Sequence, residues 1–561
     1  MPTITFLYDD LCSLIGREIP MQRLLESLFP SKFGSVESIV ENQISLEVTA
    51  DRPDLLSVEG VARELQSLLG LEKGLRRFKV ARGKVVVNVD PKIRGIRPFI
   101  SCASIRGIKL TDEAVRQMMQ LQEKLHLTYC RNRRKVSIGV HDQDRVLPTL
   151  RYDAVKPDEV RFVPLDEERE MTCREVLEQT PKGMEYADII KGFPRYPLLR
   201  DTDGNVLSMP PILNGNLTRV TAETRNLLLD VTGTDERLVN FVLNIMATNL
   251  TERGGRIEDT LIIYSGRRVR VPDLKPRKTR LEASFINQMI GLQLKPSQIT
   301  DLLRRIRYDA KPSGRNMLNV WVPAYRADIL HEVDLVEDVA IAYGYDKLKP
   351  TPILTPFFGS ELPQEVFTRL MRNLMIGLGF QEVLNYTMTS RINLHEKMNL
   401  QGNEVVEVDN PVTAEYTVLR SWMLPSLMEF LSYNKHVPYP QKIFECGDYV
   451  TIDEAKPTKT TGGKKLAVAI CNHKTSYEDI QAPLYSLLNS LGLKWNVTRI
   501  EHPSFIPGRV ASIKIGGRKV GLLGEIRPQV LNNFQIENPT AAFEIELEEI
   551  MKHKPSGTGE H

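Results

Sequence analysis

The sequence of 561 residues lacks the short signatures that mark many catalytic sites. It has no GxxxxGK[ST] loop for a triphosphate, no HExxH zinc motif, no GxSxG turn and no GxGxxG turn after a strand. A long chain without these signatures is a hydrolase of a rarer type, a scaffold, or the partner subunit of an enzyme.

Cysteine and long apolar runs are also scarce. The six cysteines are dispersed and form no CxxC pair, which argues against a zinc site and a disulfide framework. The opening residues, MPTITFLYDD, lack the basic region and apolar run of a secretory signal, and no apolar run approaches the roughly 20 residues that span a bilayer. We expect a soluble cytoplasmic protein with no membrane partner.

Neither sign of charge dominates. The chain has 74 Lys and Arg against 71 Asp and Glu, a net charge of +3, so any contact with nucleic acid must come from local patches. Two candidates for phosphate contact are the group Arg131, Arg133, Arg134 and Lys135, and the basic cluster at 267–280. Exposed helix faces or subunit contacts explain the same residues equally well.

The length predicts several domains, because single cores stop growing near roughly 250–300 residues. We predict an α+β multidomain chain. It has a mixed α/β N-terminal domain (1–84), a mixed α/β central domain (85–270), a helix–helix–hairpin–helix module with a winged-helix-like layout (271–350), and a largely antiparallel α+β domain (351–561).

Four carboxylates form the densest local cluster of acidic side chains: Asp328, Asp334, Glu337 and Asp338. A helix would place the last three on one face, where like charges need a cation or a basic partner. Oxygen ligands of this kind suit Mg²⁺. The alternatives are that the carboxylates complement the positive end of their own helix, or that Arg326 pairs with one of them at the surface.

The run VPAYRADILHEVDLVEDVAIAYGYDKL around this cluster resembles the beta subunit of archaeal- and eukaryotic-type phenylalanine–tRNA ligase. The segments DRPDLLSVEGVARELQSLLG, VLSMPPILNGNLTRVTAETRNLLLDVTGTD and VDNPVTAEYTVLRSWMLPSLM resemble the same family, in the same order along nearly the whole chain. In that family, acidic residues at the cluster's spacing are described as a Mg²⁺ site shared with the alpha subunit. The resemblance therefore implies Mg²⁺ as the cofactor.

The resemblance also implies partners and domain types. It implies an alpha subunit in an (αβ)₂ heterotetramer, tRNA(Phe) as the nucleic acid, and ATP as a substrate of the complex. It further implies a tRNA-editing-type central domain and a C-terminal class II synthetase-like sheet without catalytic motifs. In that sheet, KIFECGDYV places Cys446 and its neighbours where a phosphate-gripping Arg is expected, and VGLLGEIRPQVL has Glu525 in place of a second Arg. We therefore expect the alpha subunit to carry amino-acid activation.

An editing site is expected because an apolar pocket rejects an added hydroxyl by only about 10²-fold. The resemblance places it in the central domain, where LSMPPILNGN and LLLDVTGTD supply the candidates. Ser208, Asn214 and Asn216 would orient an ester and a water, and Asp230 or Thr232 would meet a tyrosine hydroxyl. With no Ser–His pair evident, a water positioned by substrate and backbone is favoured. The alternative is that these residues have a purely structural role in turns, where their side chains form hydrogen bonds with nearby backbone groups.

Three hypotheses follow. The leading one is a ligase subunit that supports ATP-dependent attachment of phenylalanine to tRNA(Phe) and hydrolyses mischarged Tyr-tRNA(Phe). The second is a free-standing aminoacyl-tRNA hydrolase that uses only the central domain. The third is a scaffold with a decayed central site. A C-terminal domain without catalytic motifs has no purpose in a free hydrolase, and the polar groups around Ser208 and Asn214 disfavour a scaffold.

Overall fold

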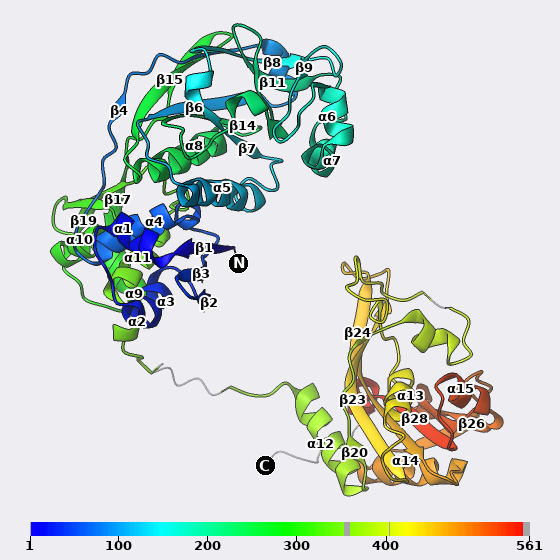
Figure 1. Cartoon of the computed structure of the whole chain (residues 1–561). Helices are drawn as coiled ribbons and strands as arrows, with labels where there is room; N and C mark the ends of the chain where they lie inside the picture. The colour runs from blue at the N-terminus through cyan, green and yellow to red at the C-terminus, as the bar shows by residue number, and fades with distance from the viewer. Residues whose placement is uncertain (1, 353–358, 403, 554–561) are drawn as a thin grey trace. The chain divides into compact units, whose positions relative to one another are not determined.

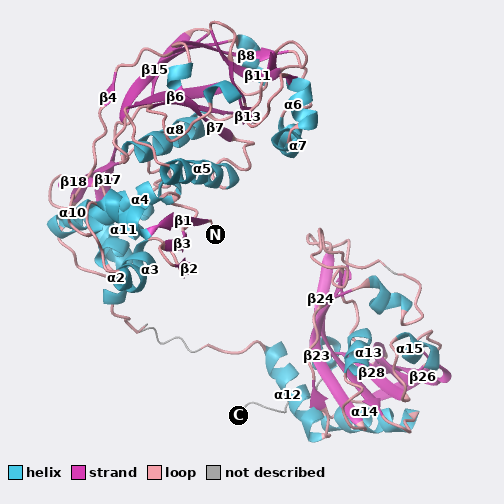
Figure 2. Ribbon diagram, in the orientation of Figure 1, coloured by secondary structure: helices cyan, strands magenta, loops and turns pink. Residues whose placement is uncertain are grey.

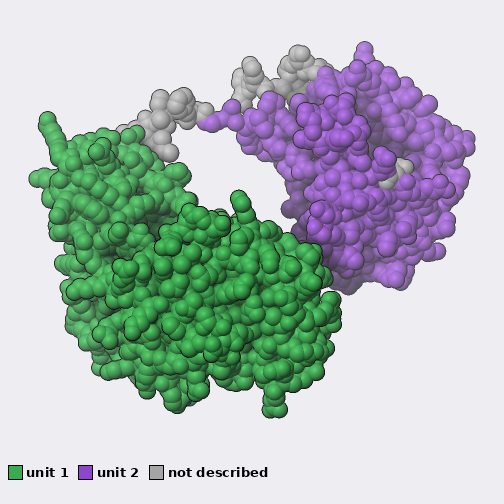
Figure 3. Space-filling view, turned by 90° about the horizontal axis from the view of Figure 1, so that it is seen from above, with its two compact units in different colours: residues 1–352 green, residues 353–561 purple. Residues whose placement is uncertain are grey.

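A computed structural model describes residues 2–352, 359–402 and 404–553. The chain folds into two compact units, Met1–Pro352 and Ile353–His561, coloured separately in Figure 3. The predicted division into four domains stays a prediction, because one apolar core in unit 1 runs from Ile4 to Tyr325. Among the described residues, no helix is both long enough and apolar enough to cross a membrane.

The first segment of unit 1 is a three-stranded antiparallel sheet in the order β1 (Thr3–Leu7), β3 (Gln43–Glu47) and β2 (Val36–Val40). Its helices are α1 (Tyr8–Ile15), α2 (Met21–Arg23), α3 (Phe29–Lys32) and α4 (Val58–Leu68). Helix α4 begins where the Ser57 hydroxyl accepts a hydrogen bond from the Gly60 amide. Only glycine fits at position 60, since a Cβ there would lie 2.0 Å from the Asp54 carbonyl oxygen.

The large sheet of unit 1 has eleven strands within the described residues. Nine follow the order β13-β12-β11-β8-β5-β15-β6-β14-β7, and β4 and β16 also pair with β15. Their bounds are β4 (Val80–Ala81), β5 (Val86–Val89), β6 (Phe99–Arg106), β7 (Val136–Asp142), β8 (Thr149–Val155), β11 (Tyr196–Asp201), β12 (Val206–Met209), β13 (Leu213–Asn214), β14 (Asn226–Gly233), β15 (Arg256–Tyr264) and β16 (Arg267–Val271).

Two long helices cover the part of this sheet that matters for function. Helices α5 (Asp112–Leu127) and α8 (Glu236–Thr251) pack beside β6, β14 and β7 (Figure 1). Strand β14 is almost entirely buried, as expected for a strand covered on both faces. Smaller elements lie near β11: β9 (Arg161–Phe162), β10 (Met171–Thr172), α6 (Cys173–Gln179) and α7 (Pro181–Tyr186).

Unit 1 ends in a small sheet with three helices. The sheet order is β17 (Arg277–Glu282), β19 (Met317–Val322) and β18 (Asp309–Pro312), and the helices are α9 (Ala283–Ile290), α10 (Pro296–Arg304) and α11 (Glu332–Tyr343). Alternate residues of the strands, including Leu281, Leu318 and Val320, join the helices in one core. The order helix, helix, hairpin, helix follows the pattern read from the sequence.

Unit 2 is built on a seven-stranded sheet that is antiparallel except where β20 meets β23 (Figure 2). Its order is β20 (Gln381–Glu382), β23 (Gln441–Ile452), β24 (Thr460–Cys471), β28 (Thr540–Glu546), β27 (Arg518–Ile526), β26 (Phe505–Ile515) and β25 (Trp495–Arg499). The remaining elements are α12 (Pro363–Gly377), β21 (Met388–Thr389), β22 (Val418–Leu419), α13 (Leu424–Tyr433), α14 (Tyr477–Ser490), α15 (Pro528–Asn533) and α16 (Leu547–His553).

The two faces of the unit 2 sheet have different side chains. On β24, Leu466 and Val468 pack in the core that contains residues of α12, α14 and α16, whereas Ala467 and Ala469 pack in the core that contains residues of α13 and α15. Because side chains alternate along a strand, these are opposite faces. The second face therefore carries the smaller residues.

Candidate functional site

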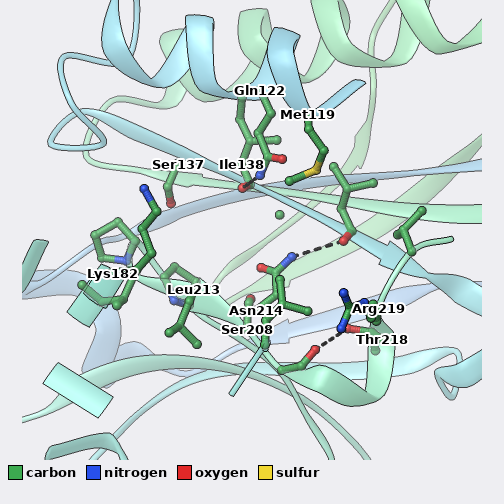
Figure 4. A pocket seen from close by; sticks show the side chains of 18 of the residues that line it. Met119, Gln122, Ser137, Ile138, Lys182, Ser208, Leu213, Asn214, Thr218 and Arg219 are labelled. Carbon is green, nitrogen blue, oxygen red and sulfur yellow. Dashed lines mark hydrogen bonds between the residues drawn. The ribbon is translucent and has the colours of Figure 1, made fainter. Parts of the chain in front are cut away.

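A cavity of about 600 Å³ lies in unit 1 where α5, β7, β14 and the β12–β13 hairpin meet. Met119 and Gln122 of α5 lie above it in Figure 4, and Leu213 and Asn214 of β13 lie across from them. Its walls are largely apolar, with a few polar groups among them. Such a cavity has the size and character of a small-molecule site.

Asp230 lies at the base of this cavity, 1% exposed, in the middle of β14. It pairs across the sheet with Gly139 of β7. A Cβ at position 139 would lie 2.2 Å from Asp230 Oδ2, so only glycine leaves room for the carboxylate. Strand β7 therefore makes space for a buried acidic group facing the cavity.

Two side chains, from His141 and Ser208, hold this carboxylate. His141 Nε2 lies 2.6 Å from Asp230 Oδ2, and the Ser208 hydroxyl donates to the same oxygen at 3.2 Å. The Nδ1 of His141 lies 2.8 Å from the Thr218 hydroxyl, and all four side chains are buried. A carboxylate oxygen accepts, so the His141 Nε2–H and the Ser208 hydroxyl are the donors in these two contacts.

The structure brings together three of the five candidate editing residues. Ser208, Asn214 and Asp230 all line the cavity, and the Asn214 side-chain amide donates to the Val140 carbonyl at 3.2 Å. His141 was missed: the sequence shows no Ser–His pair, yet Ser208 and His141 share one oxygen of Asp230. The signal lies in β7, where Ser137, Gly139 and His141 alternate with large apolar residues in a strand buried on both faces.

Asn216 and Thr232 lie outside the cavity lining. Asn216 opens a short 3₁₀ turn, Asn216–Thr218. The Thr232 hydroxyl accepts from Arg97 Nε at 3.0 Å and lies 2.9 Å from the Ser137 hydroxyl. Thr232 therefore anchors a buried Arg behind the cavity, and its predicted contact with a tyrosine hydroxyl does not fit this geometry.

The basic residues near the cavity divide into two kinds. Arg133, a candidate for phosphate contact, is buried; it donates to the Ile212 carbonyl at 2.8 Å and to Glu123 at 2.6 Å, so it braces the β12–β13 loop. Its neighbours Arg131, Arg134 and Lys135 are exposed. At the cavity itself, Lys182 and Arg219 lie on opposite sides in Figure 4.

The acidic cluster has an internal cation. Arg326 is buried and donates to both oxygens of Asp328, at 2.6 to 3.1 Å, and to Asp338 at 2.7 Å. The Tyr308 hydroxyl also donates to Asp338. The expected surface pair of Arg326 with one carboxylate is thus a buried pair with two, and a guanidinium fills the place between them.

The other two members of the cluster lie elsewhere. Asp334 accepts from the backbone amides of Leu330 and His331 at 2.6 and 2.7 Å, which caps helix α11. Glu337 is exposed, and partial burial followed by repulsion from Asp338 raises the pKa of its carboxyl. In the part of the chain that the structure describes, no three acidic, His or Cys side chains converge as metal ligands. Among the described side chains the four carboxylates therefore do not converge on one point, and Arg326 is paired with two of them, Asp328 and Asp338.

The unit 2 residues at which the resemblance leads one to expect phosphate-binding Arg side chains also make internal contacts. Cys446 is buried in the core under α12, and burial raises the pKa of its thiol to about 12. On the other face of β23, Glu445 is paired with Arg420 at 2.8 Å. Glu525 accepts from the amide of Tyr477 at 2.8 Å and from Arg509 at 2.6 Å. Each carboxylate already has a partner within the chain.

Comparisons with known proteins agree with the resemblance read from the sequence. The model of the phenylalanyl tRNA synthetase beta chain CLM domain matches residues 350–547, and that of the tRNA synthetase B5 domain matches residues 279–345. A solved structure, an N-terminal fragment of the phenylalanyl-tRNA synthetase beta subunit from Pyrococcus horikoshii, is similar with a TM-score of 0.59 and 40% identity. The match covers 61% of this chain and 99% of that fragment.

Full-length relatives extend the similarity over nearly the whole chain. The phenylalanine–tRNA ligase beta subunit of Pyrococcus furiosus is 43% identical over 98% of this chain and 100% of its own length. That of Archaeoglobus fulgidus is 40% identical over 98% of each chain. The chain therefore belongs to the family of phenylalanine–tRNA ligase beta subunits, and so is a subunit of that ligase.

Proposed function

We propose that this subunit hydrolyses Tyr-tRNA(Phe) in the unit 1 cavity. The observation that carries the proposal is the buried Asp230 carboxylate at the base of a cavity of about 600 Å³. Its Oδ2 is taken by His141 and Ser208, whereas Oδ1 makes no hydrogen bond within the described residues. That oxygen is available to a tyrosine hydroxyl.

The physical basis is selectivity. A site built to hydrogen-bond a substrate hydroxyl rejects the analogue that lacks it by about 10⁴–10⁵-fold, because its own polar group is then left unpaired. Tyrosine would satisfy Asp230 Oδ1, and phenylalanine would leave that oxygen desolvated without a partner. Correctly charged Phe-tRNA(Phe) is thereby spared, which an apolar pocket alone cannot achieve.

The reaction is cleavage of the ester between the tyrosyl carbonyl carbon and a ribose oxygen of the terminal nucleotide. Water adds its oxygen to the acyl carbon, and the ribose oxygen leaves with a proton. Ser208 and Asn214 line the cavity and would orient the ester and the water. Lys182 and Arg219 at the rim would meet the phosphates of the incoming strand.

The test uses the chain assembled with its alpha subunit. Deacylation of Tyr-tRNA(Phe) should fall by two orders of magnitude or more in Asp230→Ala, while attachment of phenylalanine is unchanged. Asn214→Ala should slow deacylation and Asn216→Ala should not, because only Asn214 lines the cavity. Wild-type complex that fails to deacylate would reduce unit 1 to a scaffold.

We further infer that the alpha subunit docks on unit 2 and carries amino-acid activation. Large apolar side chains are unusually exposed there: Leu384 by 78%, Tyr386 by 72% and Tyr433 by 73%. All three line a groove of about 820 Å³. Exposed apolar patches of this kind mark interaction sites, and aromatic residues are enriched in interface centres.

Two features support a division of labour in an (αβ)₂ heterotetramer. Arg420 and Arg509 are already paired with Glu445 and Glu525 and so are not free for a triphosphate, and we expect ATP to bind the alpha subunit. A free-standing hydrolase would leave the apolar groove exposed. Leu384→Asp with Tyr433→Asp should abolish co-purification with the alpha subunit, while Met289→Asp, an equally apolar exposed site in unit 1, should not. Co-purification that survives the double substitution would place the interface elsewhere.

A further inference from the structure

The outer face of the small sheet in unit 1 is basic. Leu281 and Val320 point into the core against α9–α11, so their neighbours on the strands point outward. The outward residues of β17 are Lys278, Arg280 and, at its end, Glu282, and β18 adds Lys311; all four are exposed. The sheet lies at the α10 side of unit 1 in Figure 1.

Strand pairing brings these cations together around one aromatic side chain. Lys278 is opposite Trp321 of β19, with its Nζ 5.7 Å from the indole centroid. One step along, Asn319 of β19 is opposite both Arg280 and Lys311. We call Lys278, Arg280, Lys311, Asn319 and Trp321 the basic face.

The cations of the basic face lack the carboxylate partners that some buried cations of unit 1 have. Arg326 binds two carboxylates and Arg253 binds two. Within the described residues, Lys278, Arg280 and Lys311 form no ion pair and donate no side-chain hydrogen bond. Like charges kept close without counter-charges are unfavourable by themselves, so an anionic partner would relieve them.

A cationic hollow continues the basic face at the edge of β18. It has a volume of about 410 Å³ and is lined by Lys73, Arg304 and Arg305, with Asp301 and Asp309 among them. Asp309 is opposite Trp321 in the sheet and is paired with Arg304 at 3.3 Å. The face and the hollow therefore meet at Asp309.

We propose that the basic face binds the sugar–phosphate backbone of tRNA, with an unstacked base or ribose against Trp321. Unpaired Lys and Arg suit phosphates, and an indole flanked by cations suits a nucleobase face. A protein partner fits less well, since Lys is depleted in protein–protein interfaces. The proposal rests on the chain's membership of a tRNA ligase and not on the chemistry of the cavity.

Trp321 is its own probe, because the chain has three Trp and the other two, Trp422 and Trp495, lie in unit 2. In the full-length W422F/W495F variant, adding a tRNA(Phe) transcript without an attached amino acid should change the fluorescence of Trp321. K278E/R280E/K311E should bind the transcript roughly tenfold or more weakly near 0.1 M salt, and the slope of log K against log salt should fall by about 2.

K92E/R94E/K109E is the matched control, with the same residue types exposed elsewhere on unit 1 and the same change of net charge. The affinity of this control variant for the transcript should stay within twofold of the wild-type affinity. If charge reversal disturbs folding, K278Q/R280Q/K311Q repeats the measurement. Wild-type affinity in both variants overturns the proposal. The proposal is also overturned if a basic-face variant binds the transcript normally but no longer binds the alpha subunit, because the basic face would then be a protein contact. Because the transcript carries no amino acid, neither result depends on deacylation.

Discussion

Two buried carboxylates, one in each unit, differ in how completely their oxygens are bound. Asp230 in unit 1 is held through one oxygen by His141 and Ser208, and it lines a cavity. Glu445 in unit 2 is held by Arg420 at 2.8 Å, with both side chains 2% exposed, and by the Asn385 amide at 2.7 Å. The first keeps an oxygen without a partner, and the second has its charge cancelled.

This difference distinguishes a position that can bind a ligand from one that only stabilises the fold. A buried ion pair whose partners are complete offers nothing to a ligand, and removing one member leaves a desolvated charge. A carboxylate with one unpartnered oxygen beside a cavity can still accept a hydrogen bond. Glu445 in unit 2 therefore has the character of a structural ion pair, whereas Asp230 in unit 1 keeps an open acceptor.

The largest effect is expected from breaking the unit 2 pair. Arg420→Met should lower the free energy of unfolding of unit 2 by about 3–5 kcal/mol, because it strands Glu445 without a cation. Urea denaturation measures this. Combining it with Glu445→Met should restore most of the loss, since the pair replaced by apolar side chains is near neutral. A single variant as stable as wild type would mean that Arg420 does not cancel the charge.

The next effect concerns recognition in unit 1. Asp230→Asn keeps the size of the side chain but replaces an anionic acceptor, so deacylation of Tyr-tRNA(Phe) should fall about 10²-fold while the slow rate with Phe-tRNA(Phe) changes little. The ratio of the two rates is the measurement, and the stability of the variant is its control. If both rates fall equally, Asp230 acts on the ester and not on the tyrosine hydroxyl.

A smaller effect is expected at His141, which positions Asp230 without lining the cavity. His141→Phe removes the hydrogen bonds to Asp230 and Thr218 and should slow deacylation roughly tenfold, with a loss of about 1–3 kcal/mol in stability. His141→Gln, which can donate and accept, should recover part of the rate. A stability loss with an unchanged rate would make His141 purely structural.

Much of the fold was predictable from the sequence. The spacing of Asp334, Glu337 and Asp338 predicts a helix, and the structure has α11 there. Widely separated strands in the C-terminal region predict an antiparallel sheet, and all pairs but one in the unit 2 sheet are antiparallel. These features depend on local periodicity, which a single sequence displays.

The partners of the polar groups were not predictable. Asp230 and His141 are 89 residues apart and meet only because β14 pairs with β7 in one register. Asp338 was read as a metal ligand because its spacing is visible along one helix, whereas its buried contact with Arg326, from the loop between β19 and α11, is not. Asn216 and Thr232 were named from their neighbours in the chain. Each lies two residues from a cavity-lining residue, Asn214 or Asp230, but neither lines the cavity itself.

The stability of the folded chain should also fall in acid, because of a buried histidine in the helix beside the cavity. Burial lowers the pKa of His126 to about 4, and its Nε2 accepts from the Ile138 amide at 2.9 Å. The folded pKa lies below the unfolded one, so the unfolded chain takes up the proton first. Stability is therefore full above about pH 6.5 and falls by about 1.4 kcal/mol per unit down to about pH 4.

Urea denaturation at pH 7 and 5.5 measures this loss, which should be about 1.4 kcal/mol from His126. His126→Gln should flatten the change, because an amide oxygen can accept from Ile138 without titrating. His473→Gln, at an exposed position, serves as control and should leave the change intact. An equal pH effect in all three proteins would assign it to other groups.

The acidic cluster should respond to metal least of all, because it resembles Glu445 more than Asp230. Arg326 already fills the space between Asp328 and Asp338, so excess Mg²⁺ should leave the thermal midpoint of the chain alone unchanged, and EDTA should not lower it. Arg326→Gln vacates the centre of the cluster, and Mg²⁺ should then raise the midpoint of that variant. A rise in the wild-type chain would show that the carboxylates bind a cation with Arg326 in place, and the parallel with Glu445 would fail.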